Sequence, residues 1–320
     1  FGLARSRIVA GDYAGAGELL RRLEKLGASR ERTALEWVQI DLATGEWDRA
    51  RVQLQELVEL NPRNLSAWTL LAALHYSRQD EAGLQECLKH LEQAERPPFA
   101  GLILQGLIAM DRQRLENARR FFEQALVLQP RNVILLGLML QLDVRMNRPE
   151  GAEARVRQLL ELDPDHAEAN YILGSLQFRR QQVTLAEASF RRSLARDRKP
   201  EALNDLAWLL QSRGMLDEAE ALVREALERN SLMASAWDSL GVILLKRGRL
   251  EESETALLKA ISLQSEQPAF QVHLAELYVA RGAMEKARPL VTRLLEQASG
   301  VEWEDRNTLL RLRREMNAGQ

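Results

Sequence analysis

Apolar residues along this chain recur with the period of an α-helix. Four positions spaced i, i+3, i+4 and i+7 share one face of a predicted helix: Trp237, Leu240, Gly241 and Leu244. Gly248 interrupts the pattern, and a second stripe then follows at Ser253, Leu257 and Ala260. This stretch therefore predicts two helices joined by a tight turn.

The same helix-turn-helix pattern repeats along the chain. A turn glycine is followed five positions later by a small residue in these pairs: Gly11 and Ala16, Gly45 and Ala50, Gly214 and Ala219, Gly248 and Ser253, Gly282 and Ala287. The first two pairs are 34 residues apart, and the others keep this step with a single one-residue slip before Pro200. A fixed period of this length is typical of stacked helical repeats.

The period divides the chain into about nine units. We expect the following boundaries: 1–30 (partial), 31–64, 65–98, 99–132, 133–166, 167–199, 200–233, 234–267 and 268–301. Residues 302–320 follow as a capping helix and tail, with Leu309, Leu310 and Leu312 available for docking. The prediction is an all-α chain in which each helix pair contacts only its neighbours.

Small residues in the first helices and large residues in the second helices predict how each pair packs. One apolar residue per second helix is expected to fill the space beside the first helix: Leu20, Leu54, Leu88, Phe122, Val156, Phe190, Val223, Leu257 and Val291. Pro289 lies inside the last of these helices. If that helix begins near Met284, the proline removes one hydrogen bond and causes a modest kink.

These motifs resemble the tetratricopeptide repeat family. The resemblance rests on Trp237-Asp238-Ser239-Leu240-Gly241 and on helix pairs that end in Asn61-Pro62, Gln129-Pro130 and Asp163-Pro164. It implies an α-solenoid, a right-handed superhelix whose concave side is lined by the first helices. It also implies a fragment of a larger bacterial scaffold protein, with further repeats expected upstream of Phe1.

The family's inward-facing positions identify candidate partner-binding residues. They are Tyr76, Ile103, Leu107, Met110, Arg145, Tyr171, Phe178, Arg179, Trp208 and Lys246. Apolar side chains bordered by cations suit an extended or helical peptide with acidic groups. The alternative is that these residues only pack against neighbouring first helices. The lysine and asparagine clamp that grips a C-terminal carboxylate in some relatives is not matched, since only Asn204 is at a plausible position.

Composition and charge narrow the classes of partner. The residues are 46% hydrophobic and 28% charged, which argues against disorder. With 44 basic and 46 acidic side chains, the net charge is −2, so no overall positive field attracts nucleic acid. Inward acidic residues such as Asp111 and Asp238 disfavour RNA reading further. We therefore expect no nucleic-acid partner.

Few residues in the sequence are candidates for metal binding or catalysis. His75, His90 and the single cysteine, Cys87, could supply three metal ligands, but packed side chains are the stronger interpretation. Acidic residues such as Glu153 and Glu254 are expected to be solvated in second helices. Phosphate-binding, zinc-hydrolase and nucleophile motifs are absent. We expect no cofactor, no metal site and no enzymatic activity, and no apolar run is long enough to insert in a membrane.

The resulting hypothesis is a scaffold that binds a protein or peptide in its concave groove. The alternative is a homodimer formed through the apolar first helices of repeats four and five, of which 99–111 is apolar on nearly every side. The arginine-rich composition indicates a bacterial protein. The segment 203–210 is similar to repeat arrays of bacterial envelope and exopolysaccharide-secretion systems, which favours the periplasm over the cytoplasm.

Overall fold

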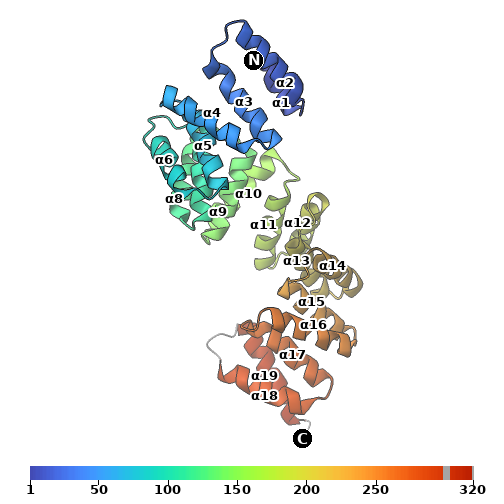
Figure 1. The fold of residues 1–320 in the computed structure, drawn as a ribbon. Coiled ribbons are helices and arrows are strands. Elements are labelled where there is room, and N and C mark those ends of the chain that lie inside the picture. The colour runs from blue at the N-terminus through green and yellow to red at the C-terminus, as the bar shows by residue number, and fades with distance from the viewer. Residues whose placement is uncertain (298–302, 319–320) are drawn as a thin grey trace. The chain divides into compact units, whose positions relative to one another are not determined.

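The computed structural model describes residues 1–297 and 303–318, which form nineteen α-helices and no strand (Figure 1). In chain order the helices are α1 (Gly2–Val9), α2 (Tyr13–Lys25), α3 (Arg30–Thr44), α4 (Trp47–Leu60), α5 (Leu65–Ser77), α6 (Glu81–Glu92), α7 (Phe99–Asp111), α8 (Leu115–Leu128), α9 (Val133–Arg145), α10 (Pro149–Leu162), α11 (Ala167–Arg179), α12 (Val183–Arg196), α13 (Pro200–Ser212), α14 (Leu216–Arg229), α15 (Ala234–Lys246), α16 (Leu250–Leu263), α17 (Pro268–Ala280), α18 (Met284–Glu296) and α19 (Trp303–Ala318). The all-α prediction is confirmed. None of these helices is long and apolar enough to cross a membrane.

The helices group into two compact units, Phe1–Gly151 (unit 1) and Ala152–Gln320 (unit 2), which are described separately. Within each unit, an odd-numbered first helix and the following even-numbered second helix form an antiparallel pair: α1–α2, α3–α4, α5–α6 and α7–α8 in unit 1, and α11–α12, α13–α14, α15–α16 and α17–α18 in unit 2. The repeat boundaries expected from the period stay a prediction.

The turn between the two helices of a pair has the same backbone conformation throughout. The five predicted turn glycines all have left-handed φ angles, between 74° and 82°. Where the repeats lack glycine, the same turn position holds Gln79, Gln113, Asn147 and Gln181, with φ between 51° and 59°. A side chain in this region is strained because its Cβ approaches the backbone. The turn geometry is therefore imposed even where the sequence carries no turn signal.

The large residue of the second helix is buried, as predicted, in eight of the nine second helices. The large second-helix residue is at most 2% exposed in each: Leu20, Leu54, Phe122, Val156, Phe190, Val223, Leu257 and Val291. The two helices of a pair approach most closely where the first-helix residue that faces the large side chain is glycine. A Cβ added to Gly106 would lie 2.2 Å from Phe122, and one added to Gly241 would lie 2.5 Å from Leu257. These glycines allow the first helix to contact the second directly.

Leu88 is the exception, and its predicted role is wrong. The buried residues of α6 are instead Leu84, Cys87 and Leu91, while Leu88 is only half-buried. Leu84 occupies a position where the other second helices have alanine or serine. A leucine there takes up more of the interior, which leaves Leu88, four positions later, only half-buried.

The C-terminal helices close the apolar core of unit 2. Helix α18 begins at Met284, as predicted, and continues through Pro289 as a single helix. Helix α19 buries Leu309, Leu312 and Met316 in a cluster with Val272 and Val291. Leu310 is half-buried, and Glu302 of the expected capping helix lies outside the described residues.

Acidic residues of the second helices lie in partly exposed positions, as expected, and they also form ion pairs with the following repeat. The Arg180 guanidinium lies 2.6 Å from Glu153, and that of Arg281 lies 2.6 Å from Glu254. The two partners are 27 residues apart in both pairs. Hydrogen bonds from Arg180 and Arg157 lower the pKa of Glu153 to about 2. Exposed pairs of this kind each contribute little to stability.

Candidate binding surface

The predicted partner-binding residues divide equally between the two units. Unit 1 contains five of them: Tyr76, Ile103, Leu107, Met110 and Arg145. Unit 2 contains the other five: Tyr171, Phe178, Arg179, Trp208 and Lys246. The two groups therefore form two local surfaces.

In unit 1 the five residues do not line a common cavity among those found in the described residues. The Tyr76 hydroxyl donates a 2.7 Å hydrogen bond to Asp111, and this bond, with burial, raises the pKa of Tyr76. Ile103 is half-buried, whereas Leu107 is 39% exposed. Met110 is only 5% exposed and packs into the core, so its side chain is not presented to a partner. Arg145 is exposed.

In unit 2 four of the five residues come together around one cavity of about 320 Å³ between α11 and α13. Its lining residues are Tyr171, Ser175, Phe178, Arg179, Phe190, Asp205 and Trp208. Lys246 does not line the cavity, and its Nζ lies 3.5 Å from the Gln211 carbonyl oxygen. The residues are brought together because Tyr171, Ser175 and Phe178 repeat at helical spacing on α11 while Asp205 and Trp208 do so on α13.

The cavity has aromatic walls, a carboxylate beside Tyr171 and a cation at its edge. The Tyr171 hydroxyl donates a 3.0 Å hydrogen bond to Asp205. Burial raises the pKa of both groups, since it disfavours their charged forms. Arg179 is exposed and has no ion-pair partner among the described side chains. The site can therefore accept an apolar group and can also pair with an anion.

Sequence reasoning did not identify Asp205 as part of this surface. A signal was present, because Asp205 follows its partner Tyr171 by 34 residues, one repeat length. Two other links between successive first helices join residues at nearly the same separation in sequence. Tyr76 bonds Asp111 and Asp238 bonds His273, each across 35 residues. His273 in turn lies beside the Trp208 ring, with ring centroids 5.9 Å apart.

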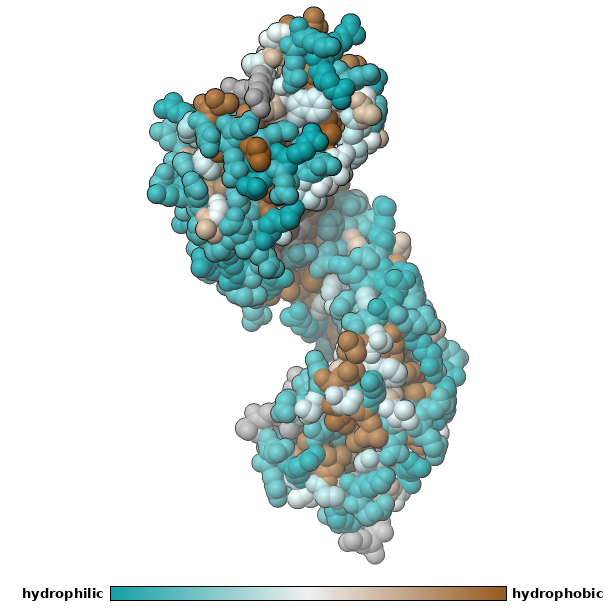
Figure 2. Space-filling view, in the orientation of Figure 1, coloured by the Kyte–Doolittle hydropathy of each residue, from teal (hydrophilic) through white to brown (hydrophobic). Residues whose placement is uncertain are grey.

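Apolar surface in unit 2 extends beyond this cavity. Figure 2 shows it gathered on the viewer's side of unit 2, where Figure 1 draws α15 to α17, with hydrophilic surface around it. A surface of this kind is a common feature of protein-binding sites.

The candidate metal ligands do not form a metal site. His75 Nδ1 lies 2.7 Å from the Asp80 carboxylate, and the His90 ring stacks on Trp68 with centroids 4.0 Å apart. Cys87 is buried, and burial raises the pKa of its thiol to about 12, which disfavours the thiolate that a metal would need. Within residues 1–297 and 303–318, no group of three or more His, Cys, Asp or Glu side chains could hold a metal ion.

Comparison with known sequences identifies the repeat. A sequence model described as tetratricopeptide repeat matches residues 35–97, 139–202, 204–268 and 247–302. The chain belongs to the tetratricopeptide repeat family. Human cilia- and flagella-associated protein 70 is 30% identical to this tetratricopeptide array over 106 residues. That match covers 31% of the array and 10% of the human protein.

Solved structures share the same fold. The Cut9-Hcn1 hetero-tetramer of the APC/C matches with a TM-score of 0.58 and 15% identity, over 93% of this array and 59% of that chain. PilF of Pseudomonas aeruginosa matches with a TM-score of 0.55 and 14% identity, over 68% and 97% of the two chains. The type IV pilus biogenesis factor PilW matches with a TM-score of 0.53 and 20% identity, over 65% of this array and 96% of that chain. At these identities the matches show a tetratricopeptide fold.

The tetratricopeptide fold defines a general role. Its repeats serve in general as scaffolds for protein–protein interaction and are typically not catalytic, because each helix pair supplies surface instead of a closed active site. Membership in the family supports this general role for the array.

Proposed function

We propose that this tetratricopeptide array binds a partner peptide through the first-helix surface of unit 2, at the cavity between α11 and α13. The observation that carries the proposal is the convergence of Tyr171, Phe178, Arg179 and Trp208 on that cavity. Residues that only pack neighbouring helices together would leave no space between them. Here the aromatic side chains surround about 320 Å³.

The cavity's chemistry indicates what the peptide presents. A volume near the lower end of the range for ligand pockets suits one or two apolar side chains. Arg179 at the edge is positioned to pair with an acidic group next to the inserted residue, because a guanidinium forms strong paired hydrogen bonds with carboxylates. Asp205 is already bonded to Tyr171 and helps to hold the wall in place. The expected ligand is an apolar residue beside an acidic one.

Selection from a random peptide display library on the full chain tests this proposal. Enriched peptides should combine an apolar residue with a neighbouring Asp or Glu. Ser175→Phe, which fills the cavity, and Arg179→Glu, which reverses the edge charge, should each weaken those peptides at least about tenfold. Circular dichroism should be unchanged in both variants.

Arg192→Glu is the matched control. Arg192 is an exposed arginine on the second helix α12 and does not line the cavity. It should leave peptide affinity unchanged. Peptides that bind Ser175→Phe as tightly as the wild type would place the binding surface elsewhere and contradict the proposal.

Self-association is a second candidate, favoured by exposed apolar residues on α7 and α9 of unit 1. Leu107 is 39% exposed, Ile134 76% and Val144 45%. Exposed apolar side chains on neighbouring repeats are a feature of many interfaces. Sedimentation at micromolar concentration should show a dimer that Ile134→Glu dissociates, whereas a clean wild-type monomer would reject this candidate.

We also propose that the array works in a bacterial envelope assembly such as exopolysaccharide secretion. The fold likeness to PilW, named as a type IV pilus biogenesis factor, agrees with such a role. Fractionation of cells that produce the full-length protein tests this, since recovery in the cytosol alone would contradict it.

A further inference from the structure

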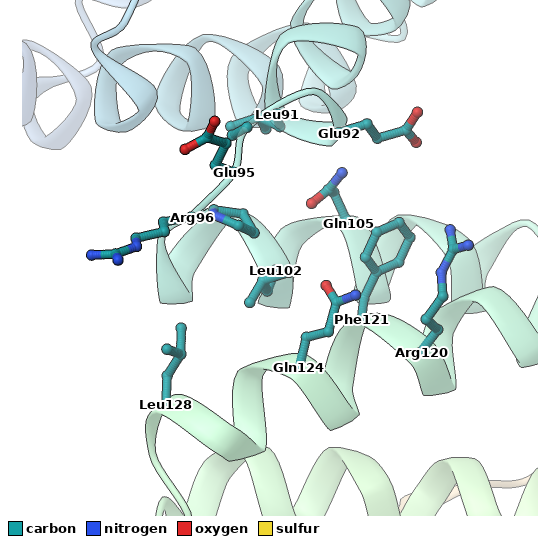
Figure 3. A pocket seen from close by; sticks show the side chains of 12 residues that line it. Leu91, Glu92, Glu95, Arg96, Leu102, Gln105, Arg120, Phe121, Gln124 and Leu128 are labelled. Carbon is teal, nitrogen blue, oxygen red and sulfur yellow. The ribbon is translucent and has the colours of Figure 1, made fainter.

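A larger cavity, of about 590 Å³, lies in unit 1 and is separate from the proposed peptide surface (Figure 3). The end of α6, the connection 93–98 and the helices α7 and α8 form it. Its apolar lining includes Leu91, Pro97, Leu102, Phe121 and Leu128. The volume is in the middle of the range for ligand pockets.

The cavity exists because α6 is short. This helix has 12 residues, whereas the second helices α4 and α8 have 14 each. Pro97 and Pro98 follow it, and proline disfavours a helical conformation in the residue before it. The last part of the repeat therefore runs as an extended connection, and the space that a longer helix would cover stays open.

A buried amide without a partner lines this cavity. Gln105 is only 3% exposed, and its Nε2 makes no hydrogen bond with any described residue. In Figure 3 the side chain points from α7 toward the end of α6. A buried amide normally finds a partner, because leaving it unpaired is unfavourable. Gln105 is therefore available to a group that enters the cavity.

The charged residues around the cavity are also unpaired. Glu92, Glu95, Arg96 and Arg120 line it, and none of the four forms an ion pair with a described side chain. The Arg120 guanidinium lies over the Phe121 ring, 5.2 Å from its centroid. Both signs of charge are present, so an anionic ligand would meet two carboxylates and a cationic ligand two guanidiniums.

We propose that this cavity binds an uncharged peptide segment, with one apolar side chain inside and a main-chain peptide group bonded to Gln105. Peptide groups carry both a donor and an acceptor, as the glutamine amide does. A hydrocarbon chain would leave Gln105 unpaired, and a phosphate-bearing or polyamine ligand would be repelled by one pair of the surrounding charges. An apolar residue with a peptide group on each side would pack against the apolar walls and also form a hydrogen bond with the Gln105 amide.

Titration of the full chain with N-acetyl-leucine N-methylamide, followed by NMR, tests the proposal. This probe has a leucine side chain between two peptide groups. It should shift the Gln105 side-chain amide and the Leu102 and Leu128 methyl signals, and the shifts should saturate. N-acetylglycine N-methylamide, which lacks the side chain, should bind at least about tenfold more weakly. An absence of saturable shifts at these residues would overturn the proposal.

Substitutions around the cavity distinguish a hydrogen bond to Gln105 from binding that only fills the cavity with apolar atoms. Gln105→Leu should weaken the leucine probe about five- to tenfold, the effect of one lost hydrogen bond. Ala94→Met places a longer side chain in the cavity and should abolish binding, whereas Gln93→Leu, an exposed change in the same connection, should have no effect.

The alternative occupant is tested with 4-methylpentan-1-ol, which has the same apolar end but no peptide group. If this alcohol binds as tightly as the leucine probe, or if Gln105→Leu leaves the probe's affinity unchanged, the site is not a peptide site. Arg179→Glu, in unit 2, should not alter binding here. The result is therefore independent of the peptide surface of unit 2.

Discussion

Two helix pairs with the same repeat length differ in how they pack. In α15–α16, Leu257 fills the space over Gly241, and the Ser253 hydroxyl donates a 2.7 Å hydrogen bond to the Gly241 carbonyl. In α5–α6, Leu84 takes the position of Ser253, Cys87 turns inward and Leu88 is left half-buried. The first pair follows the repeat pattern closely, whereas the second departs from it.

The difference lies in which second-helix residue fills the pair. A small residue at the position of Ser253 leaves room for the large residue four positions later, whereas a leucine there takes up that room and leaves Leu88 half-buried. The other interior positions are kept, because Leu84, Cys87 and Leu91 correspond to Ser253, Ala256 and Ala260, which are all buried in α16. The departure in unit 1 is followed by a short helix and by a cavity of about 590 Å³, the larger of the two cavities described above.

The largest change in the free energy of unfolding should come from replacing the corresponding leucine of each pair by alanine. Leu257→Ala should lower the local free energy of unfolding by about 2–5 kcal/mol, the range for a fully buried leucine. Leu88→Ala should lower it by less than about 1.5 kcal/mol, because this side chain is half-exposed. Amide hydrogen exchange measures both locally, which suits an array of repeats with local unfolding. Equal losses would show that Leu88 is packed as deeply as Leu257.

The buried position of Cys87 predicts a low thiol reactivity. Its pKa is raised to about 12 by burial, so little thiolate forms at pH 8. Labelling by a disulfide reagent at that pH should be at least about 100-fold slower in the folded chain than in urea. The difference in thiolate fraction between the folded and the unfolded chain is sufficient for this effect. Rapid labelling of the folded protein would instead place Cys87 at the surface.

Substitutions in the turns should change the unfolding free energy by a smaller amount, and in opposite directions in the two pairs. Gln79, between α5 and α6, and Gly248, between α15 and α16, have φ angles of 58° and 74°. Gln79→Gly should raise the unfolding free energy by about 0.5 kcal/mol, and Gly248→Ala should lower it by about 1 kcal/mol. Thermal denaturation of the two variants measures the difference. A loss of stability in Gln79→Gly would show that the glutamine turn is not strained.

The smallest effect concerns the ion pairs between repeats. Because Arg180 and Arg157 lower the folded-state pKa of Glu153 to about 2, this carboxylate stabilises the fold above its unfolded pKa. The contribution is lost as pH falls from about 4.5 toward 2. Carboxyl NMR should show a midpoint near 2 that rises in Arg180→Gln and stays unchanged in Arg192→Gln. An ordinary midpoint in the wild type would contradict the pairing.

Much of the fold could be predicted from the sequence because it depends on local patterns. Helical periodicity, turn glycines and the alternation of small and large residues identified the helix pairs and eight of the nine buried second-helix residues. The resemblance to the tetratricopeptide repeat family supplied the inward-facing positions, and these led to four of the residues around the unit 2 cavity. These features need no knowledge of what lies beside each helix.

The remaining features were decided by the tertiary structure. The partial exposure of Leu88, the burial of Met110, the bond between Tyr171 and Asp205 and the unpaired amide of Gln105 all depend on neighbouring helices. Close packing between helices decides which apolar side chains of a helix are buried, and the sequence pattern alone does not distinguish them. The sequence by itself determined the helical periodicity and the turn positions, and the contacts between helices determined which side chains were left for a partner.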